Sequence, residues 1–568
     1  MTELQDKHEV QNAVVSASGS KKVFYIFFIL LILITITCVA LSAATLSIVR
    51  RDSNSNSNLN SSSKSGSLSL ADQITVEDLL KHLEQLQVIA DQSGGTRAIT
   101  TRGFNGTLDY ITRQLEQNTK FILHHQYFTV PNYVVRGTPQ LQSQVNGAVN
   151  SHVYLTDFAY MVFSARANFT SFVRLVVIPN LGCQDADWSS VSAADAVVLV
   201  KRGDCTYIEK VTFAENYRVR GLLVYNDGTA ADRFQALQGV RAKMNSSVPA
   251  FFLSYSMGMQ LVNAANDAGE NAGIMMNADV SDAEGIGNIC ADTPSGDITK
   301  TIVVGAHSDG VPAGSGINDN GSGTIGLLVL ALNLARLFQT SSNNYPTYPY
   351  RVRFCWWGAE EIGLLGSIYH VEQAILNSDK EGERFQDYLL NLNYDMLAGP
   401  NYRFGIHDSE MAPTSTPLVA LNGTSRITAL FRQWFTEQKL PWSNSSLGGG
   451  SDYVPFLANG LAVGGVNTGA GGIKTAAERD QYAAILGTGN GGIANAAFDT
   501  CYHQQCDRIT NINPFAYEKV VKAAAYAIEY MGRLNDLEKW LYPQGRPKRL
   551  ERISRGQLYN TQNDPELY

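Results

Sequence analysis

Two adjacent carboxylates, Glu360 and Glu361, close the apolar stretch that reads RVRFCWWGAEE. Residues 351–357 have the composition of a buried strand, and like charges seldom follow such a strand merely to face solvent. Adjacency in the chain fixes the distance between the two groups. This arrangement suits a site in which one carboxylate binds a metal ion while its neighbour takes a proton from a water molecule.

Other polar residues with catalytic chemistry lie at the ends of strand-like runs or in polar loops. They are His307 and Asp309 in KTIVVGAHSDG, Asp319 in the turn GSGINDNGSG, Asp395 after LLNLNY, and Tyr502 and His503 in FDTCYHQQCDRI. Each alone has an ordinary explanation, such as turn formation for an Asp among Gly and Asn. In an open α/β sheet, however, ligands gather beyond the carboxyl ends of the strands. The shared position therefore predicts one site.

The residue types in this set are those that zinc prefers. Zinc binds imidazole and carboxylate groups, and a catalytic zinc keeps one position open for water. Two zinc ions about 3.5–4 Å apart can share one carboxylate and one water, which suits the hydrolysis of an amide bond. Two His and three carboxylates are a sensible ligand set for such a pair, and a fourth carboxylate remains to act as the base.

The elements that must position these residues alternate between strand and helix. From residue 286 onward, apolar runs such as KTIVVGAH and RVRFCWWG alternate with longer helical patterns, which predicts an α/β fold with a mostly parallel central sheet flanked by helices. The helix expected over 323–338 is apolar nearly all round and should be buried. Between about 151 and 282, short apolar runs bounded by turn residues predict a small β-rich unit.

The N-terminal region predicts a membrane anchor. Residues 23–49 contain no charged residue, which exceeds the roughly 20 residues needed to cross a bilayer. Glycosylation motifs follow the predicted span at Asn60, Asn105, Asn168, Asn245, Asn320, Asn422 and Asn444. Asn320 falls within the expected site, so we predict modification at the other six. The bulk of the chain should then be lumenal or extracellular, as in a single-pass type II membrane protein of the cell surface, vacuole, lysosome or secretory pathway. The stalk after the span also allows a shed form.

The overall charge excludes one class of partner. The formal net charge is −8, so the chain has no basic surface for nucleic acid.

Five motifs together resemble the co-catalytic zinc aminopeptidases, in particular the aminopeptidase-Y-like group. They are GAHSDGVPAGSGINDNGSGT, WWGAEEIGLLGS, NLNYDML, GGGSDYVPF and CYHQQCD. The segment with NLGCQDADW and VVLVKRGDCTYIEKV resembles the protease-associated domain that often accompanies these peptidases. The resemblance implies cleavage of the N-terminal residue from peptides with a free N-terminus.

The resemblance also implies a role for each residue. Asp319 would bridge two Zn²⁺ ions, with His307 and Asp395 completing one site and Glu361 and His503 the other. Glu360 would be the general base and then the proton donor to the leaving amine. Asp309 would accept the second ring N–H of His307, and Tyr502 would donate to the developing oxyanion. The peptide bond between Asp319 and Asn320 would be cis. Relatives with an Arg before the SD motif differ from this chain, which has Gly450, so Ser451 and Asp452 are expected to shape the pocket.

Read with this resemblance, the chain divides into six parts. They are a cytoplasmic tail (1–22), a transmembrane helix (23–49), a stalk (50–72), a zinc peptidase domain (73–150 and 283–536), an inserted protease-associated domain (151–282) and a polar C-terminal tail (537–568).

Six cysteines beyond the span fall into three pairs. The resemblance implies bridges between Cys501 and Cys506, around His503, and between Cys183 and Cys205 in the protease-associated domain. Cys290 and Cys355 both lie on expected core strands. For these two we favour free buried thiols, with a bridge open if the strands are neighbours. Bridges fit an oxidising compartment.

Two other functions remain as alternatives. One is a carboxypeptidase of the folate-hydrolase type, whose relatives carry a long helical domain after the catalytic part, whereas only about 33 residues follow position 535 here. The other is a non-enzymatic relative that has lost its ligands, whereas every expected ligand is present here.

Overall fold

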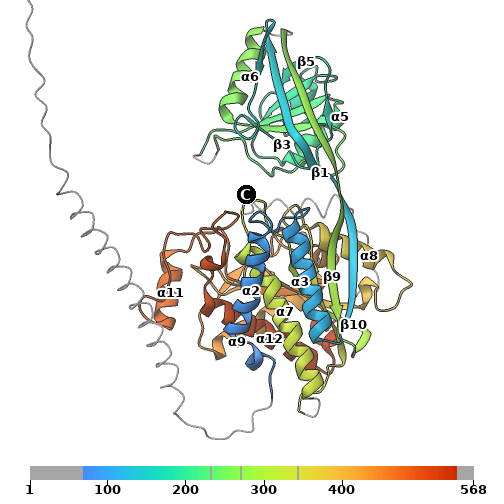
Figure 1. Ribbon diagram of the computed structural model, residues 1–568, viewed down its shortest axis with the longest axis vertical. Helices are drawn as coiled ribbons and strands as arrows, with labels where there is room; N and C mark the ends of the chain where they lie inside the picture. The colour runs from blue at the N-terminus through green and yellow to red at the C-terminus, as the bar shows by residue number, and fades with distance from the viewer. Residues whose placement is uncertain (1–67, 231–232, 269–270, 342–343, 547–568) are drawn as a thin grey trace, which may run out of the picture. The chain divides into compact units, whose positions relative to one another are not determined.

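The computed structural model describes residues 68–230, 233–268, 271–341 and 344–546 (Figure 1). The predicted cytoplasmic tail, membrane span and most of the stalk, with Asn60, lie outside the described residues. The chain divides into two units at Ser67, and the fold described below is that of the unit that begins at Leu68.

A mixed sheet with a parallel centre forms the larger part of the fold, as the alternation of strands and helices predicts. Four strands run parallel at its centre in the order β15 (Ala462–Asn467), β12 (Tyr388–Tyr394), β10 (Asp297–His307) and β11 (Tyr350–Trp357). On one side the sheet continues through β13 (Gly405–His407) and β14 (Ser443–Ser445), and on the other through β9 (Ala272–Asp292) and β1 (Ile122–Val145). The carboxyl ends of the four central strands therefore meet at one edge.

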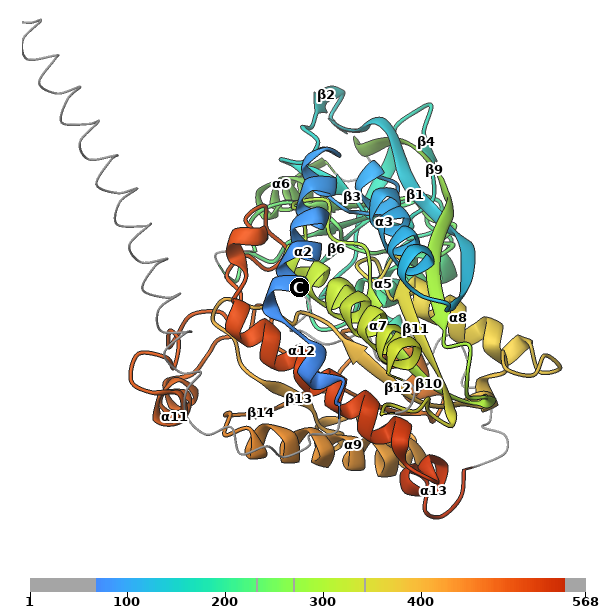
Figure 2. The ribbon, with the colours of Figure 1, turned by 60° about the horizontal axis from the view of Figure 1, so that its bottom comes forward.

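Helices cover both faces of this sheet because its strands are apolar on both sides. On β10, Ile302 and Val304 face one core cluster while Val303 faces another. The first cluster includes α2 (Val76–Asp91), α3 (Arg102–Asn118), α7 (Gly323–Thr340), α12 (Pro514–Arg533) and most of the buried face of α9 (Leu418–Glu437). The second includes α8 (Leu365–Leu376) and α10 (Val454–Ala458). Figure 2 shows α7 and α12 across the strands β10 to β12.

Helix α7 is the buried helix predicted over 323–338. Among the described residues, the stretch Ile317–Thr340 is the one helix with the length and apolar composition of a membrane span, and 83% of its most apolar window is buried in the fold. It is therefore a core helix of the sheet, and its apolar circumference follows from burial on every side.

The inserted unit has its own parallel sheet and is less exclusively β than predicted. Strands β5 (Val173–Val177), β6 (Val197–Lys201), β7 (Gly221–Tyr225) and β8 (Ala250–Leu253) run parallel, and β3 (Phe158–Tyr160) pairs antiparallel with β8. Parallel strands require crossover connections. Those from β5 to β6 and from β6 to β7 contain α4 (Asp185–Ser189) and α5 (Tyr207–Asn216), and α6 (Tyr255–Ala268) connects β8 to β9. The short strand β2 (Ala148–Ser151) pairs with β1, and the short strand β4 (Ala167–Asn168) pairs with β9.

Two long paired strands, β1 and β9, run from one sheet to the other (Figure 1). Leu141 of β1 already packs in the core of the inserted unit with Ile274 of β9, whereas Val130 packs with Ile286 nearer the larger sheet. The predicted domain boundary at residue 150 is therefore wrong, because the chain enters the inserted unit within β1. A strand that continues through two cores carries no turn signal at the boundary.

The C-terminal boundary predicted at residue 536 is also wrong. Residues Leu537–Leu541 form α13, and Leu537, Leu541 and Tyr542 are buried in the main core. The Tyr542 hydroxyl donates to the carbonyl of Leu389 at 2.8 Å and accepts from the amide of Ala462. In the sequence, the polar residues that follow α13 obscure the spacing of its apolar residues.

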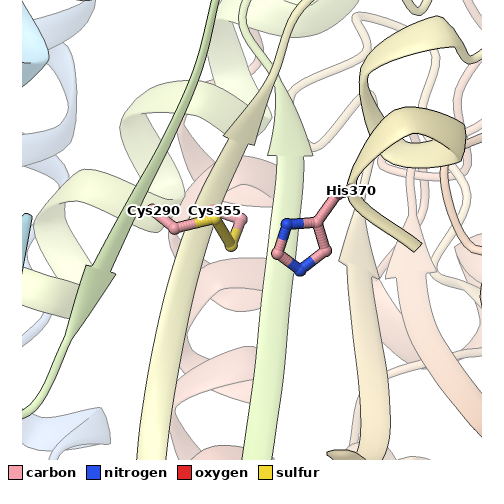
Figure 3. A group of neighbouring side chains, drawn as sticks. All are labelled: Cys290, Cys355 and His370. Atoms are coloured by element: carbon pink, nitrogen blue, oxygen red, sulfur yellow. A yellow bond between two sulfur atoms is a disulfide. The ribbon is translucent and has the colours of Figure 1, made fainter. Parts of the chain in front are cut away.

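All three cysteine pairs are bridged. The predicted bridges Cys183–Cys205 and Cys501–Cys506 are present. Cys290 and Cys355, favoured as free thiols, also form a disulfide, because β9 and β11 are antiparallel neighbours in the register that places these two residues opposite each other (Figure 3).

The imidazole of His370 lies beside the Cys290–Cys355 bridge and is itself satisfied. Its nitrogens lie 3.0 Å from Gln126 Oε1 and 3.0 Å from the Tyr388 hydroxyl, and burial lowers the pKa of His370 to about 3. The group is a packed core cluster rather than a metal site, because both sulfurs are consumed by the bridge.

Candidate active site

The five predicted metal ligands meet at the carboxyl edge of the parallel strands. His307 is the last residue of β10, Asp395 follows β12, Glu361 lies in the loop after β11, Asp319 lies in the turn Ile317–Ser322 before α7, and His503 lies in the loop between the bridged cysteines. The peptide bond from Asp319 to Asn320 is cis, as the resemblance implies.

Asp319 belongs to two separate groups of ligand atoms. Its Oδ1 lies 3.4 Å from His307 Nε2, which is 3.3 Å from Asp395 Oδ1. Its Oδ2 lies 3.1 Å from His503 Nε2, which is 3.1 Å from Glu361 Oε2. In each group of three residues the candidate ligand atoms lie within 4.8 Å of one another. The two oxygens of one carboxylate thus face two different triads.

Glu360 and Asp309 flank the His307 triad. Glu360 Oε2 lies 4.0 Å from His307 Nε2, outside both groups of ligand atoms. The carboxylate of Asp309 accepts hydrogen bonds from the backbone amides of Glu360 and Glu361, at 3.2 and 3.3 Å. His307 Nδ1 lies nearer the Asp309 carbonyl, at 3.2 Å, than its carboxylate, at 3.6 Å. Asp309 therefore holds the His307 ring with its backbone and the glutamate loop with its side chain.

The site holds an excess of buried acid. Burial raises the pKa of Glu360 well above its usual range and raises the pKa values of Glu361 and Asp452 to about 7. Glu361 Oε1 has no hydrogen-bond partner among the described residues. Buried, uncompensated carboxylate oxygens are the environment in which a divalent cation is stabilised.

The two imidazoles respond to the same excess of acid. Burial disfavours their charged forms, but Asp395 and Glu360 raise the pKa of His307 well above its usual range. Glu361 and Asp319 likewise raise the pKa of His503 to about 11. Neutral imidazole and ionised carboxylate are the forms that bind zinc. The donor set of two imidazoles and three carboxylates fits zinc, with His307, Asp395, Glu361 and His503 around the shared Asp319.

Ser451 orients Asp395. Its hydroxyl donates to Asp395 Oδ2 at 2.7 Å and accepts from Asn393 Nδ2 at 2.7 Å. The remaining Asp395 oxygen, Oδ1, is the one that faces His307. Ser451 was predicted to shape the pocket, and the structure shows that it does so by contacting a candidate metal ligand.

Tyr502 stacks on His503, with ring centroids 3.8 Å apart, and lines the same cavity as the acids. Burial, with the nearby carboxylates, raises the pKa of the Tyr502 hydroxyl well above its usual range. The phenol is therefore protonated and able to donate a hydrogen bond across the neutral pH range.

Two acids missed by the sequence analysis hold the loops together. The carboxylate of Asp507 accepts from the backbone amides of Asn318 and Asp319, at 2.7 and 3.0 Å. Asp499 accepts from the Asn318 side chain at 2.7 Å. The loop that carries His503 is thereby tied to the turn that carries Asp319. Both acids lie within the quoted stretch FDTCYHQQCDRI, in which the sequence analysis gave a role only to Tyr502, His503 and the two cysteines.

Arg97 is a buried cation that the sequence analysis missed. Its side chain is fully buried and donates to the carbonyls of Ser315 at 2.9 Å, Ser308 at 2.7 Å and Gly316. These acceptors span the loop from His307 to the turn before Asp319. Burial lowers the pKa of the guanidinium, while nearby carboxylates oppose that effect. Arg97 therefore clamps the segment that positions two ligands.

We expect Arg97→Lys to disturb this clamp although it keeps the charge. Lysine carries a point charge without the planar fork, so it cannot replace all three bonds, and a buried unpaired acceptor costs about 1–3 kcal/mol. The urea midpoint should fall and kcat should drop about a hundredfold, because the ligands move by a fraction of an ångström. The control is Arg102→Lys, an exposed residue at the start of α3. Equal stability and turnover in both variants would contradict this role.

The sequon asparagines differ in exposure. Asn105, Asn168, Asn245, Asn422 and Asn444 are exposed, whereas Asn320 is fully buried and donates to the carbonyl of Tyr394. The exclusion of Asn320 agrees with its burial, and glycosylation of the others stays a prediction.

A cavity of about 200 Å³ opens over the acids. Its wall includes Glu360, Asp395 and Tyr502 from the larger sheet, the Gly448–Ser451 loop, and two arginines, Arg403 and Arg241. It is large enough for an amino-acid side chain, and four carboxylates line it, those of Asp319, Glu360, Glu361 and Asp395.

Comparison with known proteins agrees with this architecture. The model of peptidase family M28 matches residues 288–528, and the PA domain model matches residues 171–261. A probable leucine aminopeptidase 2 of Aspergillus fumigatus is 30% identical over 464 residues, which cover 81% of this chain and 84% of the relative. An aminopeptidase of Pseudomonas aeruginosa is 29% identical over 473 residues, 82% of each chain.

Solved structures share the fold. An aminopeptidase from Aneurinibacillus sp. strain AM-1 superposes with a TM-score of 0.59 at 19% identity, covering 82% of this chain and 96% of that chain. The zinc aminopeptidase BSAP of Bacillus subtilis gives a TM-score of 0.55 at 19% identity, covering 83% and 98%. The extent of the match to the fungal relative, together with the two family models, confirms the resemblance inferred from the motifs: this chain belongs to peptidase family M28 and carries an inserted PA domain.

Proposed function

We propose that this chain is a di-zinc aminopeptidase that removes the N-terminal residue from peptides. The observation that carries the proposal is the position of Asp319, whose two oxygens face separate triads of ligand atoms. A carboxylate placed in this way can be shared by two neighbouring ions. The relatives from Pseudomonas aeruginosa and Aspergillus fumigatus are named as aminopeptidases, which supports the same activity.

Two metals would be held by the two triads. His307 and Asp395 would complete one site and Glu361 and His503 the other, with Asp319 common to both. When bound, zinc supplies polarisation of the scissile carbonyl and a lower pKa for the attacking water.

The chain's own residues would then perform the proton transfers. Glu360 lies beside the ligands without belonging to either triad, so its carboxylate is free to accept a proton from the attacking water and return it to the leaving amine. Tyr502, protonated, would donate to the oxygen on which negative charge develops. The carboxylates that line the cavity would bind the ammonium group of the substrate.

The membrane anchor is part of the proposal. Residues 23–49 would hold the enzyme as a type II protein with its peptidase domain lumenal or extracellular. Three disulfides and five exposed sequon asparagines among the described residues support an oxidising, glycosylating compartment.

The test uses the full chain, purified with its membrane span in detergent. We expect hydrolysis of leucine p-nitroanilide, none of its N-acetylated form, loss of activity with a chelator, and recovery with zinc. Elemental analysis should find about two zinc ions per chain, one for each triad. Release of C-terminal residues from an N-blocked peptide would support the carboxypeptidase alternative, and absence of bound zinc would support a non-enzymatic relative.

A further inference from the structure

Arg241 of the PA domain lines the cavity that holds the candidate metal ligands. It lies more than sixty residues before His307 in the chain, outside every motif of the peptidase domain. The cavity wall is otherwise built from the peptidase domain, so Arg241 is the contribution of the inserted domain to it. The question is what a cation at this position recognises.

The backbone around Arg241 directs its side chain away from the PA-domain core. Val162 accepts a hydrogen bond from the Ala242 amide at 2.7 Å and donates to the Val240 carbonyl at 2.8 Å. Val240 and Ala242 are both buried in the PA-domain core. Because side chains alternate along an extended segment, Arg241 faces the opposite side.

A mixed apolar cluster holds this segment next to the catalytic loop. Phe163, Val162 and Met244 of the PA domain pack in one cluster with Ala359 and Ile362. The last two residues bracket Glu360 and Glu361 in the sequence. The position of Arg241 is therefore coupled by packing to the loop that carries the proposed base.

The two arginines of the cavity differ in the contacts that their guanidinium groups make. Arg403 donates to Ser445 Oγ at 3.1 Å, and its guanidinium lies 4.9 Å from the centre of the Phe498 ring. Arg241 is half-buried, and among the described residues no carboxylate, carbonyl or ring pairs with its guanidinium. A half-buried guanidinium without a partner is free to bind an anionic group, and its planar fork suits a carboxylate.

We propose that Arg241 is a specificity-determining residue that binds a carboxylate of the peptide on the leaving-group side of the scissile bond. The inference rests on the proposed function. The carboxylates that line the cavity would bind the N-terminal ammonium, and a carboxylate beyond the scissile bond would then need a separate cationic partner. A substrate positive at one end and negative at the other matches a cavity that is lined both by carboxylates and by Arg241.

Two sources supply such a carboxylate, and four substrates separate them. Leu-Gly against Leu-Gly-NH₂ measures recognition of a C-terminal carboxylate, and Leu-Glu-NH₂ against Leu-Gln-NH₂ measures recognition of an acidic side chain. The measured quantity is the ratio of kcat/KM within each pair. In the wild-type protein at least one ratio should favour the carboxylate member.

The variant Arg241→Gln should lower that ratio about tenfold, chiefly through KM, because a hydrogen-bonded charge pair is lost away from the reacting atoms. Arg241→Lys should retain much of the preference. The matched control is Arg220→Gln, which removes the same charge from an exposed PA-domain residue outside the cavity and should leave both ratios unchanged.

The outcomes separate this inference from the proposed function. Ratios that change less than twofold in Arg241→Gln, or an equal loss on all four substrates, would overturn the role of Arg241 while leaving the aminopeptidase intact. Failure of the wild-type protein to cleave any of the four substrates would instead overturn the proposed function.

Discussion

Replacing Glu360 by Gln should reduce kcat at least about a thousandfold while leaving zinc binding unchanged. The amide keeps the shape of the side chain but cannot accept a proton, and general acid–base catalysis contributes about a hundredfold to ten-thousandfold. Glu360 lies outside both triads, with its nearest carboxylate oxygen 4.0 Å from His307 Nε2. The ligand set therefore survives the substitution.

Two quantities are measured on the same sample: the turnover of leucine p-nitroanilide, and the zinc content by elemental analysis. Glu381→Gln is the matched control, because Glu381 is 65% exposed and lies outside the cavity. Normal turnover by Glu360→Gln would remove Glu360 from the role of base. Loss of zinc would instead make it a ligand.

Replacing Asp319 by Ala should abolish zinc binding at both of the proposed sites, whereas replacing Asp395 by Ala should remove binding at one. Asp319 offers Oδ1 to the His307 triad and Oδ2 to the His503 triad, whereas Asp395 belongs to the His307 triad alone. Removal of a residue that merely supports a ligand lowers metal affinity about 10–100-fold. Loss of the shared ligand should therefore weaken affinity at both sites by more than about a hundredfold.

Zinc titration of the metal-free protein tests this difference. The expected stoichiometries are near zero for Asp319→Ala and near one for Asp395→Ala at zinc concentrations that saturate the wild-type protein. Two zinc ions retained by Asp319→Ala would exclude the shared position of this carboxylate. Equal loss in both variants would show that the two sites bind as one cooperative unit.

Much of the candidate site was predictable because its residues end strands that run parallel. His307, Glu361 and Asp395 follow three neighbouring central strands, and parallel strands bring their carboxyl ends to one edge. The sequence therefore shows both that these side chains can bind metal and that they lie at the ends of neighbouring strands. The burial of α7 was predictable for a similar reason, since a helix apolar on every side can be stable in water only when it is covered.

Contacts to backbone atoms could not be predicted. The three acceptors of Arg97 are carbonyl groups, which every residue carries, so no pattern of side chains marks them. Asp507 likewise binds backbone amides of the turn before α7. Such contacts depend on where two distant loops lie in space, and only the folded chain determines that.

The sequence by itself determined which residues can bind zinc, which strands end beside them, and the family to which the chain belongs. The tertiary structure decided three matters. The register of β9 against β11 places Cys290 opposite Cys355, where the two form a disulfide. The strand β1 contributes residues to two separate core clusters. The packing of the PA domain places Arg241 in the lining of the cavity. The physical reason is common to all three, because each depends on the distance between segments far apart in the chain, and local composition carries no record of that distance.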